Sequence, residues 1–282
     1  MNAIRTDHLI DLALEEDAGL GDVTSRAIFD ATHKSRAFVS AGQDLVVCGL
    51  EVAARVFTRV DASLKVTLAA RDGDRVRAGR VVLRVSGPTV ALLTAERTAL
   101  NFLQRLSGIA TLTHKFVDAA SGTGISIVDT RKTTPGWRAL EKYAVRCGGG
   151  RNHRSSLGEH VIIKDNHIAA AGSIGRAVQR VRAAAPHLAR IEVEAKTRAE
   201  VRAAVRAGAD VILLDNMTPA QVAAAVAMIG GASLVEVSGG VRLETLREYA
   251  LPGVDVISVG ALTHSAPAAD LSLTIQPTRR AS

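Results

Sequence analysis

The stretch HVIIKDNHIAAAGSIGRAVQRVRAAAPHLARIEVEAKTRAEVRAAVRAGADVILLDN, from His160 to Asn216, decides the fold of the chain. It contains three short runs rich in β-branched and aliphatic residues, at 160–165, 190–195 and 211–215. Between them lie two longer Ala- and Arg-rich segments with apolar residues at helical spacing. The short runs have the length and composition of strands. Strands that alternate with helices predict a parallel sheet with right-handed crossovers.

The same alternation continues on both sides of this stretch. Further strands are predicted at 125–129, 233–239 and 255–260. Six such strands over about 140 residues favour an α/β barrel, closed or incomplete, and an open doubly wound sheet is the alternative. The predicted helices of this part are 173–185, 197–207, 218–229 and 243–250.

The N-terminal part has a different texture. Short β-like runs separated by turn signals extend from Arg36 to Pro88, with a helix near 50–59 among them. This pattern predicts a small α+β domain. The helices predicted around it are 5–17, a strong one at 89–106 that Ser107 and Gly108 end, and another near 110–120.

Composition and charge exclude several classes of protein. Apolar residues make up 47% of the 282 residues, yet no run of eighteen or more is apolar, so no membrane span is expected. The net charge of +7 raises the question of nucleic-acid binding. We expect none, because no run of five Lys or Arg occurs and much of the surplus is Arg scattered on Ala-rich helices.

The cysteines and the N-terminus point to a compartment. Cys48 and Cys147 are about a hundred residues apart with no metal-ligand spacing, so neither a structural disulfide nor a zinc site is expected. The first residues lack the apolar core of a signal peptide. Both observations favour a cytoplasmic protein.

A dense basic block, DTRKTTPGWRALEKYAVRCGGGRNHRSSLGEHVIIKDNH, occupies 129–167. Its cations and the three glycines at 148–150, which let a backbone approach a ligand, predict a site for a polyanionic small molecule. The alternative is an exposed loop whose cations pair with acids such as Glu141 and Glu159. The cations of the block are Arg131, Lys132, Arg138, Lys142, Arg146, Arg151, Arg154 and Lys164, with His153, His160 and His167 among them.

Later strands end on carboxylates and glycine turns that are typical of ligand-binding sites. Glu194 and Asp215 end neighbouring strands, where carboxylates hold Mg²⁺ or ribose hydroxyls, and we expect Asp165 near them. The alternative for these acids is an interior ion pair with Lys164 or Lys196. Turns SGG at 238–240 and SVG at 258–260, with His264 beyond, suit a phosphate.

These motifs together resemble one family. The block above, from DTRKTTPG through LEKYAVRCGGG to KDNH, closely resembles quinolinate phosphoribosyltransferase, also called nicotinate-nucleotide pyrophosphorylase (carboxylating). Further matches in the same order are EDAGLGDVTS (16–25), ERTALNFLQRLSGIAT (96–111), EVEAKT (192–197), LLDNM (213–217), EVSGGV (236–241) and SVGALTHS (258–265).

The resemblance implies an α/β fold with an N-terminal α/β sandwich domain, taken as residues 1–110, and an incomplete parallel α/β barrel, residues 111–282. Whether the C-terminal tail packs back on the N-terminal domain stays open. It also implies a homodimer with shared active sites and a Mg²⁺ cofactor. The implied reaction joins quinolinate to 5-phosphoribosyl 1-diphosphate and releases diphosphate and CO₂. The product, nicotinate mononucleotide, lies on the de novo route to NAD.

The resemblance also implies roles for single residues. Lys132, Lys164, Glu194 and Asp215 would be catalytic, and Glu194 and Asp215 would hold the metal. Arg131, His153, Arg154 and Lys164 would bind the dicarboxylate, Lys132 with Lys164 the diphosphate, and Arg97 would reach the site of the neighbouring subunit. The implied substrate-binding set is Arg97, Arg131, Lys132, Thr133, His153, Arg154, Lys164, Glu194, Asp215, Ser238, Gly239, Gly240, Ser258, Val259, Gly260 and His264.

Three alternatives stay open at this point. A paralogous transferase-like group of the same fold, found with molybdate-transport genes, lacks the full EKYAVR…KDNH pattern that this chain keeps. A Schiff-base aldolase barrel would use Lys164 or Lys196 in an apolar setting. A nucleic-acid-binding protein would show steeply salt-dependent binding.

Overall fold

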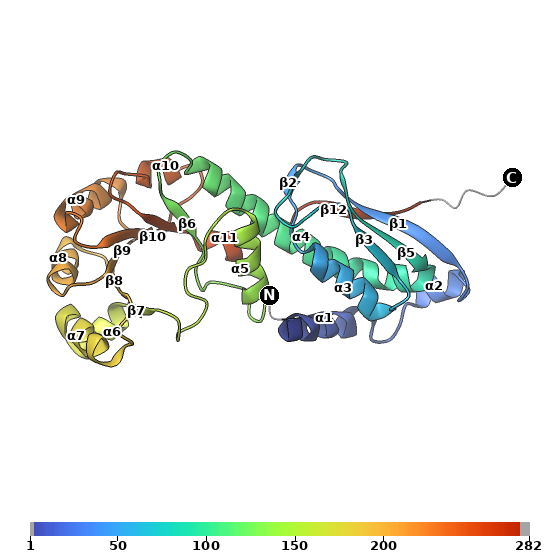
Figure 1. Cartoon of the computed structure of the whole chain (residues 1–282), viewed down its shortest axis with the longest axis horizontal. Coiled ribbons are helices and arrows are strands. Elements are labelled where there is room, and N and C mark those ends of the chain that lie inside the picture. The colour runs from blue at the N-terminus through green and yellow to red at the C-terminus, as the bar shows by residue number, and fades with distance from the viewer. Residues whose placement is uncertain (1–2, 277–282) are drawn as a thin grey trace. The chain divides into compact units, whose positions relative to one another are not determined.

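The structure is a computed structural model and describes residues 3–276 (Figure 1). The chain forms two compact units. One contains residues 3–114, 134–149 and 265–276, and the other contains 115–133 and 150–264. These units are discontinuous, whereas the division expected at residue 110 is linear.

The first unit is built on an antiparallel sheet in the order β12-β1-β5-β3. Strand β12, close to the end of the described chain, pairs with β1 from Arg36 opposite Gln276 to Ala41 opposite Leu271. The strands of this unit are β1 (Lys34–Ala41), β2 (Leu45–Val46), β3 (Lys65–Leu68), β4 (Arg75–Val76), β5 (Val81–Pro88) and β12 (Leu271–Gln276). Its helices are α1 (Ala3–Ala18), α2 (Val23–Ile28), α3 (Leu50–Val60), α5 (Arg138–Cys147) and most of α4 (Thr89–Ala119).

Helix α4 corrects one prediction. Its apolar stripe, Leu92, Ala95, Ala99, Leu103 and Leu106, is buried as the spacing predicts. The expected end at Ser107-Gly108 and the separate helix after it are wrong, because α4 runs unbroken to Ala119. Both small residues serve packing instead. The Ser107 hydroxyl bonds to the backbone of Cys48, and a Cβ on Gly108 would lie 2.0 Å from the carbonyl oxygen of Pro267.

Helix α5 explains why 134–149 belongs to the first unit. Its residues Leu140 and Ala144 are buried, and Trp137, just before it, stacks on Phe102 of α4 with ring centroids 4.7 Å apart. The amphipathic helix thus buries its apolar face within this unit. The middle of the basic block is therefore largely a structural helix.

The second unit contains a parallel sheet in the order β6-β11-β10-β9-β8-β7. The order follows the chain from β7 to β11, and β6 then pairs with β11, as in a barrel wound in one direction. No ladder joins β6 to β7 within the described chain, so the barrel is incomplete, and the doubly wound alternative is wrong. The strands are β6 (Ser126–Val128), β7 (Val161–Ile163), β8 (Ile191–Ala195), β9 (Val211–Asp215), β10 (Leu234–Ser238) and β11 (Val256–Ser258).

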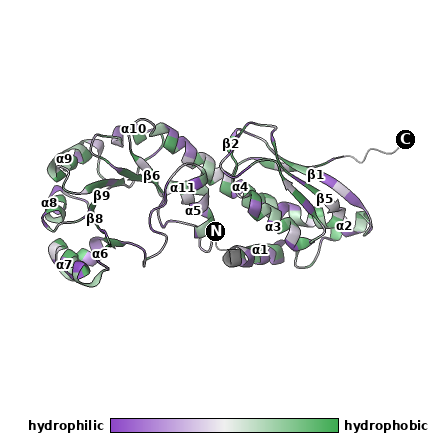
Figure 2. Ribbon diagram, in the orientation of Figure 1, coloured by the Kyte–Doolittle hydropathy of each residue, from purple (hydrophilic) through white to green (hydrophobic). Residues whose placement is uncertain are grey.

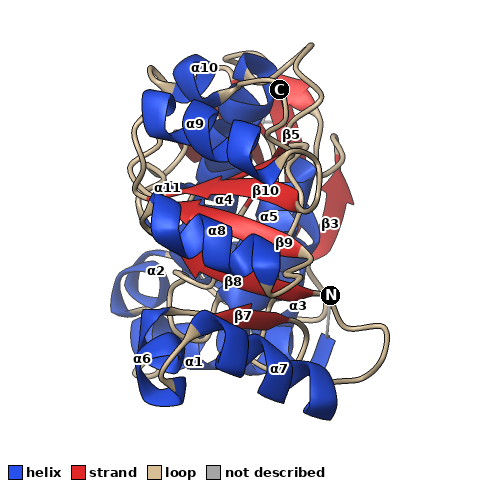
Figure 3. Cartoon of the chain, turned by 90° about the vertical axis from the view of Figure 1, so that its left-hand side faces the viewer, coloured by secondary structure: helices blue, strands red, loops and turns tan. Residues whose placement is uncertain are grey.

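Helices cover the outer face of this sheet, and Figure 3 shows α8 and α9 in front of the strands. Strand residues on that face, such as Val193, Ile212 and Val237, are fully buried. The central strands are correspondingly apolar in Figure 2. Side-chain caps from Thr197 and Thr218 start α8 and α9. The helices are α6 (Asp165–Ala171), α7 (Ile174–Ala184), α8 (Arg198–Arg206), α9 (Pro219–Ile229), α10 (Leu246–Tyr249) and α11 (Ala261–His264).

Among residues 3–276, no helix has both the length and the apolar character needed to cross a bilayer.

Replacing Gly108 with Ala tests the close approach at α4. A methyl group there would meet the Pro267 carbonyl, so we expect Gly108→Ala to lower the free energy of unfolding by about 2–3 kcal/mol. Gly175 in α7 is the matched control, since a Cβ there meets nothing within 4 Å. Gly175→Ala should be neutral or gain up to about 1 kcal/mol. Equal urea midpoints for both variants would contradict the packing role of Gly108.

Candidate active site

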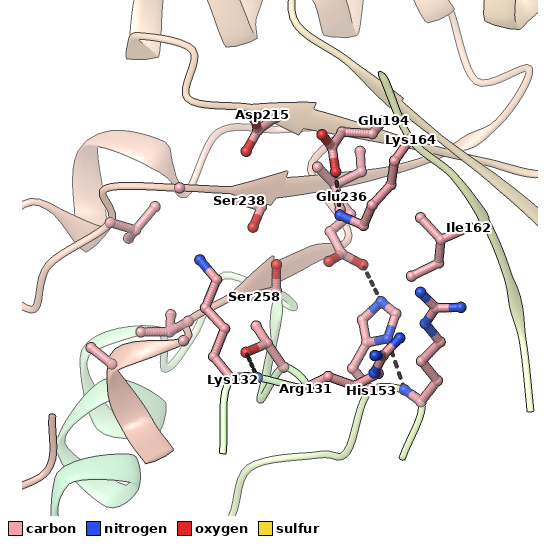
Figure 4. Close-up of a pocket in the computed structure, with 18 of the residues that line it drawn as sticks. Arg131, Lys132, His153, Ile162, Lys164, Glu194, Asp215, Glu236, Ser238 and Ser258 are labelled. Atoms are coloured by element: carbon pink, nitrogen blue, oxygen red, sulfur yellow. Dashed lines mark hydrogen bonds and ion pairs between the residues drawn. The ribbon is translucent and has the colours of Figure 1, made fainter. Parts of the chain in front are cut away.

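A pocket of about 730 Å³ opens in the second unit at the carboxyl ends of its strands (Figure 4). On β8, β9 and β10 the lining includes Glu194, Leu213 with Asp215, and Glu236 with Ser238. Within a strand these positions are two apart, so their side chains leave the same face of the sheet. That face is the interior of the barrel.

One wall of the pocket is a loop after β6 that carries Arg131 and Lys132. The Thr130 hydroxyl accepts from the Lys132 N–H at 3.0 Å, and the Thr263 hydroxyl donates to the Lys132 carbonyl at 2.7 Å. These bonds fix the backbone while the lysine side chain points into the pocket (Figure 4). Gly260 permits this arrangement, since a Cβ there would lie 3.1 Å from Cδ of Lys132.

A second wall comes from the loop that holds His153 and Arg154. Asp129, fully buried at the end of β6, accepts from the His153 N–H at 2.8 Å and from the Asn152 amide at 2.6 Å. Arg151 continues the sheet by pairing beside Val128. The loop is therefore fastened to the first barrel strand, and this brings residues 153 and 154 to the pocket.

Two buried glutamates lie behind His153. Its Nε2 atom is 3.3 Å from a carboxylate oxygen of Glu192 and 3.5 Å from one of Glu236. The glutamates are 6% and 4% exposed, and the Oε1 atom of each has no hydrogen bond in the described structure. Two carboxylates this deep must share a proton or a cation to be stable.

His153, Glu192 and Glu236 share one extra proton. Burial lowers the pKa of His153, but hydrogen bonds and charge from Glu192 and Glu236 outweigh it and raise the pKa to about 10. However, the backbone N–H of Arg154 donates to Nδ1 of His153 at 2.7 Å, so that nitrogen carries no proton in this geometry. Both observations agree if the extra proton lies on a carboxyl group. Burial indeed raises the pKa of Glu192. The cluster therefore binds its proton as a unit.

The other charged groups are arranged around this cluster. The Nζ atom of Lys164, at the N-terminus of α6, pairs with Glu194. Arg154 is 7% exposed and donates from Nη1 to the His160 carbonyl at 3.0 Å, and burial and the charge of Arg131 lower its pKa. Asp215 lines the pocket from the end of β9.

Glycine turns form the remaining wall. Gly239 and Gly240 have φ of +90° and +68°, a region that favours glycine. A Cβ on Gly239 would also lie 2.3 Å from the Asn216 side chain. A Cβ on Gly260 would likewise crowd a neighbouring side chain, because it would lie 3.2 Å from Nε2 of His264. These turns keep the pocket floor free of side chains.

The pocket brings together most of the residues that the sequence predicts for the substrates. Thr133 is not among the lining residues, and its hydroxyl donates to the Arg131 carbonyl at 3.4 Å. Arg97 is exposed on α4 in the first unit. The predicted residues that line the pocket are Arg131, Lys132, His153, Arg154, Lys164, Glu194, Asp215, Ser238, Gly239, Gly240, Ser258, Val259, Gly260 and His264.

One expectation about the neighbourhood needs revision. The sequence suggests that the glycines after α5 approach a ligand, but Gly148 packs on α4, where a Cβ would lie 2.4 Å from the Ala110 carbonyl.

Asp165 does not itself line the pocket. It pairs with Lys196 at 2.8 Å, and Lys196 in turn interacts with Glu194 and Asp215.

Other lining residues have no role predicted from sequence. The alternation of side chains along a strand could have revealed Glu236 and also Glu192, which lies beneath the pocket. Glu192 is two positions before Glu194 on β8, and Glu236 is two positions before Ser238 on β10, so both face the interior of the barrel. The other lining residues follow no such pattern. The additional lining residues are Thr130, Leu157, Ile162, His167, Leu213, Glu236, Val241, Arg242 and Ala261.

The geometry weakens the Schiff-base alternative. Lys164 and Lys196, the candidates for a Schiff base, both form ion pairs with carboxylates, whereas a Schiff-base lysine needs a neutral amine.

An incomplete barrel whose strand ends combine cations, carboxylates and glycine turns defines an α/β-barrel enzyme for an anionic, phosphorylated substrate. The family model "Quinolinate phosphoribosyl transferase, C-terminal domain" matches residues 109–274, and "Quinolinate phosphoribosyl transferase, N-terminal domain" matches 22–107. The chain belongs to the quinolinate phosphoribosyltransferase family.

Individual relatives agree along nearly the whole chain. A probable nicotinate-nucleotide pyrophosphorylase [carboxylating] of Bacillus subtilis is 43% identical over 98% of this chain and 95% of its own length. Quinolinate phosphoribosyltransferase [decarboxylating] 2a of Nicotiana tabacum is 42% identical over 95% of this chain and 81% of its own. The crystal structure of NadC from Streptococcus pyogenes has a TM-score of 0.92 and 42% identity, covering 98% of this chain and 99% of that one.

The shared proton predicts how stability depends on pH. The folded pKa of about 10 lies above the ordinary histidine value of about 6.5, so the stabilisation is complete below pH 6.5 and is lost as pH rises towards 10. We expect the advantage of the wild type over the double variant Glu192→Gln/Glu236→Gln, which lacks both carboxylates, to shrink by about 3 kcal/mol between pH 7 and pH 10, measured by urea unfolding. Parallel curves for the two proteins would rule the shared proton out.

Proposed function

We propose that this pocket is where the chain transfers the 5-phosphoribosyl group of 5-phosphoribosyl 1-diphosphate to quinolinate. The reaction releases diphosphate and CO₂ and forms nicotinate mononucleotide for NAD biosynthesis. The observation that carries the proposal is the meeting of three sets of groups in one pocket. Cations, carboxylates and glycine turns suit a dicarboxylate, a ribose with a metal, and a phosphate respectively.

Arg131, Arg154, His153 and Lys164 would bind the two carboxylates of quinolinate. Arginine forms paired hydrogen bonds with a carboxylate. Arg154 is buried, and Arg131 is half-buried. Lys164 already pairs with Glu194, so it can exchange that partner for a substrate carboxylate. Each charge-assisted hydrogen bond contributes about 1.5–3 kcal/mol, which makes a doubly charged ring the best-matched ligand.

The phosphoribosyl group would lie across the strand ends. Glu194 and Asp215 would accept from the ribose hydroxyls, and the glycine turns at 238–240 and 258–260, with His264, would receive the 5-phosphate. Lys132 points between these groups and would contact the diphosphate (Figure 4). A phosphate needs several N–H donors in a small space, and turns without side chains provide them.

The carboxylates of Glu194 and Asp215 also fit Mg²⁺, because they are hard oxygen ligands on neighbouring strands that line the pocket. When bound, the ion would neutralise the diphosphate. Glu194 and Asp215 would hold it, directly or through the diphosphate oxygens.

The chain's own groups then favour transfer by charge. Departure of diphosphate leaves positive charge on the sugar and negative charge on the leaving group. Lys132 and Lys164 stabilise the negative charge on the diphosphate, and Asp215 and Glu194 stabilise the positive charge on the sugar. The pyridine nitrogen attacks the anomeric carbon, and the resulting cationic ring accepts the electron pair of the bond to the 2-carboxylate as CO₂ leaves. The ring carbon that carried this carboxylate then takes up a proton from solvent. No covalent intermediate with the protein is required.

We expect wild-type protein with quinolinate, 5-phosphoribosyl 1-diphosphate and Mg²⁺ to form nicotinate mononucleotide, and Arg131→Ala or Lys132→Ala to lose at least about a hundredfold in kcat/KM. Arg202→Ala, on the exposed face of α8, is the charge-matched control and should keep activity. Turnover of nicotinate or nicotinamide instead, or wild-type rates in both pocket variants, would refute the assignment.

We also propose that the working enzyme is a homodimer in which Arg97 of one copy acts in the site of the other. Arg97 is exposed on the polar side of α4 in the first unit, opposite buried Leu92 and Ala99. An exposed arginine on a rigid helix can serve a neighbouring subunit.

Mixing two inactive variants tests this sharing. Arg97→Ala and Lys132→Ala proteins lose different halves of a shared site, so a mixed dimer contains one intact site. After exchange of subunits we expect the mixture to regain up to about a quarter of wild-type activity, measured as nicotinate mononucleotide formed. A mixture no more active than its components, although mixed dimers are seen by native mass spectrometry, would place Arg97 in the site of its own chain or outside it.

A further inference from the structure

Cys48 and Cys147 are far apart in sequence but adjacent in the first unit. Their Sγ atoms and a carboxylate oxygen of Asp72 all lie within 4.8 Å of one another, and both thiols are free. We propose that Cys48 and Cys147 form a reversible dithiol–disulfide site that reacts with low-molecular-weight disulfides such as oxidised glutathione.

The surroundings hold both cysteines in place. The Cys48 N–H donates to the Ser107 hydroxyl at 2.9 Å, and that hydroxyl donates to the Cys48 carbonyl at 3.2 Å. Cys147 is the last residue of α5, whose next residue, Gly148, packs closely on α4. Side-chain rotation between two fixed elements can therefore bring the sulfur atoms to bonding distance.

The two thiols differ in a way that suits a two-step reaction. Cys48 is fully buried, whereas Cys147 is partly exposed. The hydrogen bond from Cys48, assisted by Tyr143 and the charge of Arg146, lowers the pKa of Cys147, although burial and the charge of Asp72 oppose it. The same hydrogen bond, with burial, raises the pKa of Cys48. Cys147 is thus the accessible nucleophile, and Cys48 is the thiol that resolves the mixed disulfide between Cys147 and glutathione.

The chemistry balances without other reactants. The Cys147 thiolate attacks one sulfur of oxidised glutathione and displaces one glutathione thiolate. Cys48 then loses its proton to solvent, and its thiolate attacks the Cys147 sulfur and displaces the second glutathione as a thiolate, which solvent protonates. Two protein thiols are oxidised to one disulfide, and one oxidised glutathione is reduced to two glutathione molecules.

The bond would join two helix ends. Cys48 immediately precedes the N-terminal cap of α3, where Asp72 accepts from the Gly49 and Leu50 N–H groups at 3.0 Å. Cys147 ends α5, and Tyr143 of that helix donates to the same Asp72 side chain at 2.9 Å. The disulfide would add to this polar contact a covalent link that closes a loop of about 100 residues.

The test equilibrates the full-length protein in glutathione buffers of increasing oxidation and follows it by mass spectrometry of tryptic peptides. We expect a Cys48–Cys147 linked peptide, a mass loss of two hydrogens, full reversal by dithiothreitol, and a Tm higher by roughly 5 °C without reductant. A stable glutathione adduct on Cys147 of the wild type, or two unreacted thiols in fully oxidised buffer, would overturn the proposal.

Two variants separate the roles. Cys48→Ser should accumulate the glutathione adduct on Cys147, because the resolving thiol is gone. Cys147→Ser should leave Cys48 unmodified, because that thiol is buried. Modification of Cys48 at the wild-type rate in Cys147→Ser would contradict this order. Zn²⁺ retained after dialysis at one equivalent, with both thiols blocked, would assign the cluster to metal binding instead.

Discussion

The pocket depends on the burial of two carboxylates, Glu192 and Glu236, inside the barrel. Neither could remain fully ionised at 6% and 4% exposure without compensation, because an isolated buried anion costs several kcal/mol. His153 provides part of that compensation through Nε2, and a retained proton provides the rest. The cluster thereby fixes which ring nitrogen of His153 is protonated. The cluster also sets the negative charge that lies next to the arginines and lysines of the pocket.

The fold makes this arrangement possible at little cost. In a parallel strand buried on both faces, alternate residues face the helices and the interior. On β8, Val193 packs outward while Glu192 and Glu194 face inward, one above the other. Glu192 belongs to the buried cluster, and Glu194 lines the pocket. One strand thus supplies both the support of the site and its working surface.

Much of the barrel could be predicted from sequence because its signals are local. Runs such as VILLD at 211–215 are too short and too apolar to be surface helices, and they recur between amphipathic segments. The unit boundaries could not be predicted in this way. Gly108 looks like a helix end in the sequence. In the structure its lack of a side chain leaves room for the carbonyl group of Pro267, which is 159 residues away in sequence. Likewise, the long separation of Cys48 and Cys147 conceals a contact that depends on how α5 packs. Local patterns reveal elements, whereas close approaches between elements depend on packing that no local pattern encodes.

The charge balance of the pocket connects these observations to substrate choice. Arg131, Lys132, Arg154, Lys164 and Arg242 bring five positive charges, while Glu194, Asp215 and the proton-sharing cluster bring about three negative ones. The pocket is therefore slightly cationic by itself, and Lys164 is held by Glu194 until an anion competes for it. A dicarboxylate supplies two negative charges to this surplus, whereas a ligand with a single carboxylate supplies one. Discrimination then follows from charge rather than from the shape of the pocket, which at about 730 Å³ could admit smaller rings.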